Sequence, residues 1–440
     1  MMRLPAERSS ETRPSGRRDE RRRTPSPRGW ACCAAALLVV AACSGGATTS
    51  PISTTRSGTI GFGVLSCFTG ILAPLGRAML QGAQVAETAI NSAGGVLGRQ
   101  LAVTYADTGC DSTDAVPAVH QLLDGDRDAG IIGPETDDIS SDELIVTTAK
   151  VPTEFQGGWT EFDHNTNPYL WRDSPSDSQL GVAMAVYAKR MGYDSAALMF
   201  YSDPGGQTFI QPITRTYTKL GGTVVANVTL PPDQPSYASQ VAQVVAAHPQ
   251  VIFTQTDAAT AAVLFGDLAR SGGSAIPVVG TDVTASGEYL KAITYPAAHD
   301  RLVSIYGASV TGSAADAFGS TFTARFGGAS SPLPNANYAY DAAVSLALAM
   351  DQAGTTDGTT VVRSMTRVTN PPGTQCSTYA TCLSALKAGK KINYEGASGD
   401  LDYNRFNNVF GPYGAFRATP GGDQNQVASM SAEELARATP

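Results

Sequence analysis

The chain has 440 residues, of which 42% are hydrophobic, and it carries 31 basic and 39 acidic residues for a formal net charge of −8. This length is too great for one compact core and is sufficient for two lobes. Nucleic acid is bound by neutralising its phosphates, so an acidic chain without a basic stripe is not expected to bind it. No segment after the first 42 residues is apolar enough to span a membrane as a helix.

The N-terminal segment has the parts of a secretory signal. Nine arginines and no lysine precede an apolar run at residues 31–42, which is too short to span a bilayer. Cys43 directly follows small residues and resembles the lipobox cysteine of bacterial lipoproteins. That resemblance implies that residues 1–42 are a signal peptide and that Cys43 carries a lipid anchor in the cell membrane. The alternative is an ordinary signal peptide cut nearby, with Cys43 unmodified.

Residues 43–57 are mostly Ser, Thr, Gly and Pro, a composition typical of a flexible tether. Without residues 1–42 the chain keeps 22 basic and 35 acidic residues, which gives a net charge of −13. The body of the protein is therefore more acidic than the whole chain.

Short β-rich runs alternate with segments of helical periodicity from residue 59 onward. This alternation predicts a parallel sheet covered by helices on both faces. The expected strands are residues 59–65, 101–106, 130–132, 151–155 and 169–172, and the expected helices are residues 79–91, 115–123 and 140–148.

The same pattern restarts after Pro175 and predicts a second α/β lobe. Residues 301–306 are interpreted as a segment that crosses back between the lobes. The expected strands of this lobe are residues 195–201, 223–228, 251–254 and 277–279, and its expected helices are residues 180–191, 209–220, 237–247 and 260–270. After the crossing segment, further helices are expected at residues 314–326, 339–353 and 359–365.

These elements give the expected division of the chain into lobes. We assign residues 58–174 and 304–390 to the first lobe, and residues 175–303 and 391–423 to the second. Residues 424–440 are polar and are interpreted as a loose tail.

Four cysteines remain in the body of the chain, and an even number in an exported chain suggests disulfides. Cys67 and Cys110 each follow an expected strand end, which predicts one bridge. Cys376 and Cys382 are six apart in a turn-like stretch, which predicts a second, local one. A zinc site is the alternative, but there is no C-x-x-C pair and no nearby His.

The motifs of common enzymes are absent from the sequence. The four histidines are scattered and form no H-E-x-x-H pair, and there is neither a G-x-S-x-G elbow nor a Walker loop. We therefore expect a protein that is not an enzyme and that uses no cofactor or metal. An exported enzyme remains the weaker alternative, because a fold does not by itself determine function.

Several short motifs resemble one known family in the same order along the chain. The most specific is the stretch at residues 90–98, which is close to the pattern IN-x-x-GG-(I/V)-x-G. With it the chain resembles the type I periplasmic binding proteins, within the leucine/isoleucine/valine-binding branch of ABC-transporter substrate-binding lipoproteins. The other matching stretches are residues 61–66, 69–70, 80–83, 101–107, 131–134, 338–343 and 396–402.

This resemblance implies a fold and a function. The fold would be α/β, with two Rossmann-like lobes of parallel sheet joined by crossover strands and a ligand held between them. The function would be an extracytoplasmic receptor that delivers a small polar solute, such as an amino acid or an amide, to an ABC permease by closing its cleft. We expect a monomer. A domain that senses ligand for a membrane signalling partner is the alternative.

The resemblance also points to ligand-binding residues. Asp282 falls where branched-chain amino-acid binders carry an acid for the ligand's ammonium group, and its alternative role is a helix N-cap. Thr136 and Asp137 lie in the loop that would hold a ligand carboxylate. Asp137 and Asp138 replace small hydroxyl residues of the family, and Glu135 adds to the negative charge. This charge opposes a ligand carboxylate, unless the side chains point away as caps of the following helix, and it favours a cationic, zwitterionic or hydroxylated ligand.

The remaining candidates come from four other loops. Trp159 would stack on a flat ligand group or, alternatively, pack in the core, and the two aspartates of the second lobe have ordinary turn roles as alternatives. These candidates are Leu75, Gln156, Gly157, Trp159, Tyr201, Asp203 and Asp257.

Overall fold

The computed structural model describes most of the chain from Gly58 onward. The expected signal peptide, the tether and the lipidation site Cys43 lie outside the described residues. Between residues 58 and 439 the residues that are not described are Ile71, Asp137, Tyr295, Ser309, 328–334 and 420–423.

The first lobe is built on a five-stranded, entirely parallel sheet with the order β2-β1-β3-β4-β5. Phe62 and Val64 in β1 are fully buried, as are Leu65 and Ile131 on the opposite face, because both faces of a parallel sheet are covered. The strands are β1 (Ile60–Ser66), β2 (Leu101–Asp107), β3 (Gly130–Ile132), β4 (Thr153–Phe155) and β5 (Leu170–Arg172).

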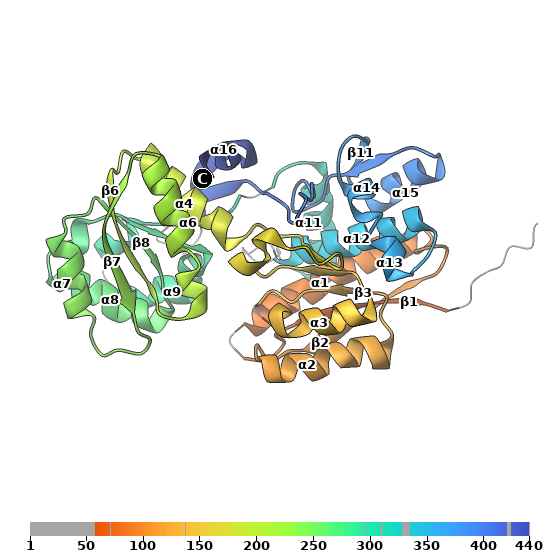
Figure 1. Ribbon diagram of the computed structural model, residues 1–440, viewed down its shortest axis with the longest axis horizontal. Coiled ribbons are helices and arrows are strands. Elements are labelled where there is room, and N and C mark those ends of the chain that lie inside the picture. Colours follow the sequence, from red (N-terminus) through yellow and green to blue (C-terminus); the bar gives the residue numbers. More distant parts are fainter. Residues whose placement is uncertain are drawn as a thin grey trace, which may run out of the picture. The chain divides into compact units, whose positions relative to one another are not determined.

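Helices cover both faces of this sheet (Figure 1). α2 and α3 pack on one face, and α1 and α12 on the other, where Gly82 allows the two backbones to approach closely. The helical segments of this lobe are α1 (Ala73–Ser92), α2 (Ser112–His120), η1 (Gln121–Asp126), α3 (Ile139–Ala149), η2 (Thr160–His164), α11 (Ser313–Phe326), α12 (Asn335–Ala353), α13 (Gly358–Val361), α14 (Met365–Thr369) and α15 (Tyr379–Lys387).

The second lobe has a seven-stranded sheet with the order β14-β13-β10-β9-β8-β6-β7. Five strands are parallel, while β13 and β14 add an antiparallel edge. The strands are β6 (Ser195–Tyr201), β7 (Thr223–Leu230), β8 (Val251–Gln255), β9 (Val278–Gly280), β10 (Leu302–Gly307), β13 (Tyr413–Ala418) and β14 (Gln424–Met430).

Helices also cover both faces of the second sheet (Figure 1). α4 and α6 pack on one face, and α7, α8 and α9 on the other. The helical segments are α4 (Asp177–Arg190), α5 (Pro204–Gln207), α6 (Ile210–Lys219), α7 (Ala238–Ala246), α8 (Ala258–Arg270), η3 (Gly273–Ala275), η4 (Asp282–Ala285), α9 (Gly287–Ala292), α10 (Pro296–His299) and α16 (Ala432–Ala438).

The described chain passes between the lobes after β5, after β10 and again before β13. The expected α/β fold of two lobes joined by crossovers is therefore confirmed. A small two-stranded parallel sheet of β11 (Thr374–Cys376) and β12 (Ile392–Tyr394) completes the first lobe.

The division between the lobes differs from the expected one at two places. β10 pairs with β9 and β13, so residues 304–307 belong to the second lobe and not to the first. Residues 392–409 supply Ile392, Tyr403 and Val409 to the core of the first lobe, although the sequence placed them in the second.

The expected polar tail is also different in the structure. Its first residues form β14, an edge strand that pairs with β13, and its last residues form α16, whose Leu435 is fully buried. β14 is mostly exposed because it covers the edge of the sheet, and its composition therefore resembles that of a loop.

Candidate functional site

A cavity of about 220 Å³ lies between the two lobes. The first lobe contributes the loops after β3 and β4 and the start of α12, and the second contributes the loop after β9 and the ends of β10 and β13. Residues at the carboxyl ends of parallel strands therefore meet here from both sheets, which is the usual position of a ligand in α/β folds.

Glu135 is the acid that the first lobe places at this cavity. Its Oε1 accepts hydrogen bonds from the Ser66 hydroxyl (2.8 Å) and from the Cys67 backbone N–H (3.4 Å). Its Oε2 is buried and has no partner among the described residues. Burial raises the pKa of Glu135 to about 7, against the lowering effect of these hydrogen bonds.

Asp282, a candidate from the family resemblance, is the acid that the second lobe contributes to the cavity wall. It is the first residue of the short helix η4, while Thr281 occupies the cap position and makes no side-chain cap. The alternative role of Asp282 as a helix cap is thus not observed. Burial raises the pKa of this carboxyl group.

Asp177 is a third acid at the cavity and was not predicted as a site residue. It begins α4 directly after the first crossover, and its carboxylate accepts a hydrogen bond from Thr208 (3.1 Å). Burial, followed by the charge of Asp282, raises the pKa of Asp177 to about 7. In the sequence it is an ordinary acid in the first turn of a helix, which gave no signal of a site.

Gln156 and three tyrosines complete the polar wall of the cavity. The Gln156 Oε1 accepts a hydrogen bond from Asn335 (3.2 Å), and its Nε2 is buried without a partner among the described residues. Tyr306, Tyr338 and Tyr413 also line the cavity, and none of the three was predicted from the sequence as a site residue.

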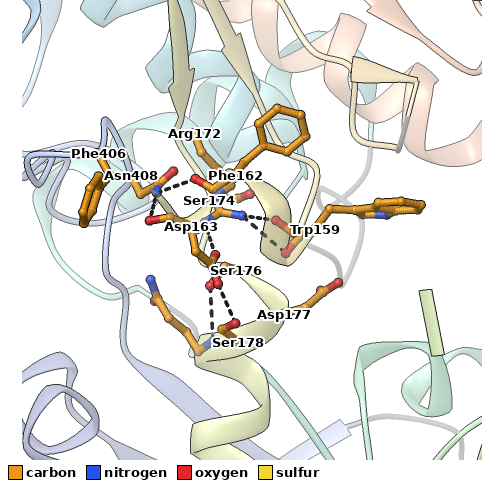
Figure 2. Close-up of polar contacts among 12 residues, drawn as sticks. Trp159, Phe162, Asp163, Arg172, Ser174, Ser176, Asp177, Ser178, Phe406 and Asn408 are labelled. Carbon is orange, nitrogen blue, oxygen red and sulfur yellow. Dashed lines mark hydrogen bonds and ion pairs between the residues drawn. The ribbon is translucent and has the colours of Figure 1, made fainter. Parts of the chain in front are cut away.

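Arg172 fixes the loop that carries Gln156 relative to the first crossover. Its buried guanidinium donates to the carbonyl of Trp159 (2.9 Å) and pairs with Asp163 at 2.5 Å, and Asp163 also accepts a hydrogen bond from Ser178 of α4 (2.5 Å). Figure 2 shows these bonds, with the carboxylate of Asp177 directed away from the Arg172–Asp163 pair. This network joins the first lobe to the start of α4.

The other predicted residues of the first lobe have mixed positions. Leu75 lines the cavity as expected. Thr136, Gly157 and Trp159 are not among its lining residues. The Thr136 hydroxyl donates to Asp138 (2.8 Å), and Trp159 packs beside a hydrophobic cluster, in agreement with its alternative role. The predicted Asp137 lies outside the described residues.

The three remaining predicted residues of the second lobe do not line the cavity either. Asp257 caps α8 by accepting the Thr260 N–H (2.7 Å), and Asp203 accepts the Gly206 N–H (2.6 Å). Tyr201 makes a hydrogen bond with the Thr260 hydroxyl (2.5 Å). The local roles that the sequence offered as alternatives for the two aspartates are therefore the ones observed.

The two expected disulfides, Cys67–Cys110 and Cys376–Cys382, are both present. The first joins the segments that follow β1 and β2. It therefore restrains the segment that carries Cys67, whose backbone N–H donates a hydrogen bond to Glu135.

A larger and more open cavity of about 740 Å³ lies beside the first crossover, with Arg172, Asn408 and Phe406 in its wall. It receives no described residue from the loops after β1, β3, β8 or β9. We therefore take the smaller cavity as the candidate ligand site.

Neither a cluster of metal ligands nor a membrane-spanning helix occurs among the described residues. No group of His, Cys, Asp and Glu side chains is arranged to hold a metal ion, and no helix in the described part has the length and hydropathy needed to cross a membrane.

Comparison with protein families gives one match that covers most of the chain. The model of a family described as "Periplasmic binding protein" matches residues 59–403. Among curated proteins, an amino acid binding protein of Pseudomonas aeruginosa is 32% identical over 82 residues, which are 19% of this chain and 22% of that protein. The chain thus aligns with only about a fifth of that relative.

Solved structures share the fold at low sequence identity. The leucine binding protein LivK of Thermotoga maritima superposes with a TM-score of 0.69 at 19% identity and covers 85% of this chain and 99% of its own. LivJ of Streptococcus pneumoniae in complex with isoleucine superposes with a TM-score of 0.67 at 19% identity, and the match covers 85% of this chain and 99% of LivJ. A solute binding protein of R. palustris in complex with benzoate superposes with a TM-score of 0.65 at 17% identity, and the match covers 85% of this chain and 97% of that protein.

Proposed function

We propose that the chain, which belongs to the periplasmic binding protein family, takes up a small polar solute in the cavity between its lobes. The family consists of binding proteins, so the chain is a binding protein and not an enzyme. An extracytoplasmic location follows from the same membership.

The cavity is the observation that carries this proposal. Its volume of about 220 Å³ suits a small solute, and both lobes contribute to its wall. Glu135 Oε2 and Gln156 Nε2 are buried there without partners among the described residues. An unpaired buried polar atom costs free energy, so a solute that pairs with both atoms would stabilise the protein.

We further propose that the receptor acts as a monomer, hands its solute to the permease of an ABC transporter and is tethered by lipid on Cys43. Transfer of the solute to a permease is supported by the structural similarity to ABC-transporter binding proteins of R. palustris and Sphaerobacter thermophilus. The tether is supported by the small residues and apolar run before Cys43. It would keep the receptor beside its membrane partner.

A thermal-shift screen of the purified protein tests the binding function. Amino acids, amides, aromatic acids, amines and polyols are added one at a time, and at least one should raise the melting temperature in a saturable manner, because a ligand that binds only the folded state stabilises it. The absence of any saturable shift across the panel would contradict solute binding.

The tether has its own test in cells. Cys43→Ser should move the protein from the membrane fraction to the soluble exported fraction. An unchanged distribution between the two fractions would contradict lipidation of Cys43.

A further inference from the structure

The wall of the interlobe cavity carries acids from both lobes. Glu135 belongs to the first lobe and Asp282 to the second, and Asp177 lies at the start of α4. Lys, Arg and His are absent from the described residues that line this cavity. Arg172 lies close enough for its charge to lower the pKa of Asp177, but it is already paired with Asp163. The acidic charge of the wall therefore lacks a matching cation.

Two atoms of this wall point to a ligand independently of the charge. Gln156 is only 7% exposed, and its Nε2 has no acceptor among the described residues. Glu135 Oε2 is likewise buried and lacks a donor. A ligand that satisfies both atoms needs a hydrogen-bond donor or positive charge on one group and an oxygen acceptor on another.

The same wall has an aromatic component. Tyr306, Tyr338 and Tyr413 all line the cavity. The faces of aromatic rings attract cations, and clusters of such rings are used to recognise substituted ammonium groups. Acids and tyrosines in one small cavity are therefore complementary to the same kind of ligand.

We infer that the solute held in this cavity is an organic ammonium compound that carries no carboxylate, with its positive charge among Glu135, Asp177 and Asp282. A hydroxyl or carbonyl oxygen of the same compound accepts from Gln156 Nε2. This inference rests on the proposed function, since it assigns a ligand class to the same site.

The positions expected to receive a carboxylate argue against an anionic group. Glu135 occupies the wall in the first of the two expected loops, and the Thr136 hydroxyl is used by Asp138. In the second loop the carboxylate of Asp177 lies against Gly158, because a Cβ on Gly158 would be 2.1 Å from Asp177 Oδ1. A ligand carboxylate would therefore meet like charges at both loops.

The ionisation of the acids makes this inference measurable. Burial raises the pKa of Glu135 and of Asp177 to about 7, so each binds a proton in part of the empty protein at neutral pH. A bound cation favours the charged carboxylates and would release those protons. Glu135 faces Asp138, the Ser66 hydroxyl and the Cys67 N–H. Asp177 faces Asp282, Thr208, Arg172 and Asp163.

The alternative ligand reverses the proton change. If Glu135 stays protonated and donates to a ligand carboxylate, binding of an amino acid takes up protons or leaves their number unchanged. Its affinity would then rise, not fall, as the pH is lowered from 8 to 6. The direction of proton transfer thus separates the two ligand classes.

The experiment is isothermal titration of the purified protein with two matched pairs of probes. Choline is compared with glycine betaine, and ethanolamine with glycine, because within each pair a carboxylate replaces the hydroxymethyl group and the ammonium group is kept. Titrations at pH 7 in two buffers of different ionisation enthalpy count the protons. The inference predicts that one of the cations binds at least about tenfold more tightly than its carboxylate partner and that it releases protons.

Leucine, isoleucine and benzoate are titrated beside these probes. Binding of one of these, or of a carboxylate probe, with no tighter binding of the cations would overturn the inference and leave the solute-binding function standing. If none of the seven compounds binds, the inference fails for these cations. The broader thermal-shift screen then decides whether the function fails as well.

Two variants and one control locate the effect. Glu135→Gln keeps an oxygen for the Ser66 hydroxyl and replaces the free Oε2 by a donor, so it should weaken the cation at least about tenfold without weakening its carboxylate partner. Asp282→Asn should weaken the cation similarly. Glu288→Gln, an exposed acid on α9, should change neither affinity. Equal weakening of both members of a pair by Glu135→Gln would contradict the inference.

Discussion

At the cavity, the close approach of the two lobes depends on Gly158. Its carbonyl accepts the Asp177 backbone N–H at 2.8 Å and one N–H of Arg172 at 3.3 Å. The space of its missing side chain holds the carboxylate of Asp177, since a Cβ would lie 2.1 Å from Oδ1. A glycine is therefore needed here for room and not for backbone flexibility.

Gly158→Ala should weaken solute binding at least about tenfold, because the added methyl group displaces the Asp177 carboxylate from the cavity wall. Gly287→Ala is the matched control, since no heavy atom lies within 4 Å of the Cβ built there. Titration of both variants with the solute found by screening measures the difference. Equal affinities of the two variants would contradict this role for Gly158.

Arg172 is the charged residue whose loss should cost the most stability. Arg172→Met leaves Asp163 and two carbonyls without their donor, and breaking a buried pair costs about 3 to 5 kcal/mol. The control Arg437→Met removes an exposed pair with Glu433 on α16 and should cost less than about 1 kcal/mol. Urea unfolding of both variants tests this, and similar losses would contradict the assignment.

At the scale of elements, the contact between α1 and α12 organises one face of the first lobe. α12 is rich in small apolar residues and is buried over most of its length. Gly82 of α1 faces the carbonyl oxygen of Ala336 at the start of α12, only 2.0 Å from the position of a Cβ. The distance between the helices is therefore limited by a glycine.

Gly82→Ala should destabilise the protein by about 1 to 3 kcal/mol, because overpacking forces the two helices apart. Gly319→Ala, in the interior of α11, meets no atom within 4 Å and should instead stabilise by about 0.5 to 1 kcal/mol through helix propensity. Changes in thermal unfolding with the same sign for both variants would contradict this packing argument.

The sequence was sufficient for elements whose pattern is local. The alternation of strands and helices predicted both lobes, because a parallel sheet covered on both faces requires that order. It was insufficient for β14 and α16. An edge strand is mostly exposed and a seven-residue helix buries little, so neither has a strong apolar pattern.

The same distinction separates the cavity residues that the sequence predicts from those that it misses: a local motif marks the former and not the latter. Among the candidates taken from the family resemblance, Leu75, Gln156 and Asp282 line the cavity. Asp177 and Tyr413 were missed because they reach the cavity only when the crossovers bring α4 and β13 to it. Neither has a local motif that distinguishes it from an ordinary helix start or strand end.

At the scale of the whole molecule, buried acids without basic partners determine the response to pH. Burial raises the pKa of Glu135, Asp142 and Asp177 to about 7 in each case. Both carboxylate oxygens of Asp142 lack partners among the described residues. The folded protein therefore binds more protons than the unfolded chain between the unfolded pKa values near 4 and about pH 7.

The free energy of unfolding should accordingly fall as the pH rises from about 5 to 8, because stability decreases wherever the folded state binds more protons. Asp142→Asn should reduce this fall, while the exposed control Glu288→Gln should leave it unchanged. Urea unfolding at a series of pH values measures the dependence. A stability that rises with pH over this range would contradict the assignment of neutral buried carboxyl groups.

The most direct test of the whole account is a crystal structure of the protein with the solute that stabilises it most in the screen. The solute should lie between the lobes, in contact with Glu135, Gln156 and Asp282. A solute found instead in the larger cavity beside Arg172 and Phe406, with the interlobe cavity empty, would contradict the central claim.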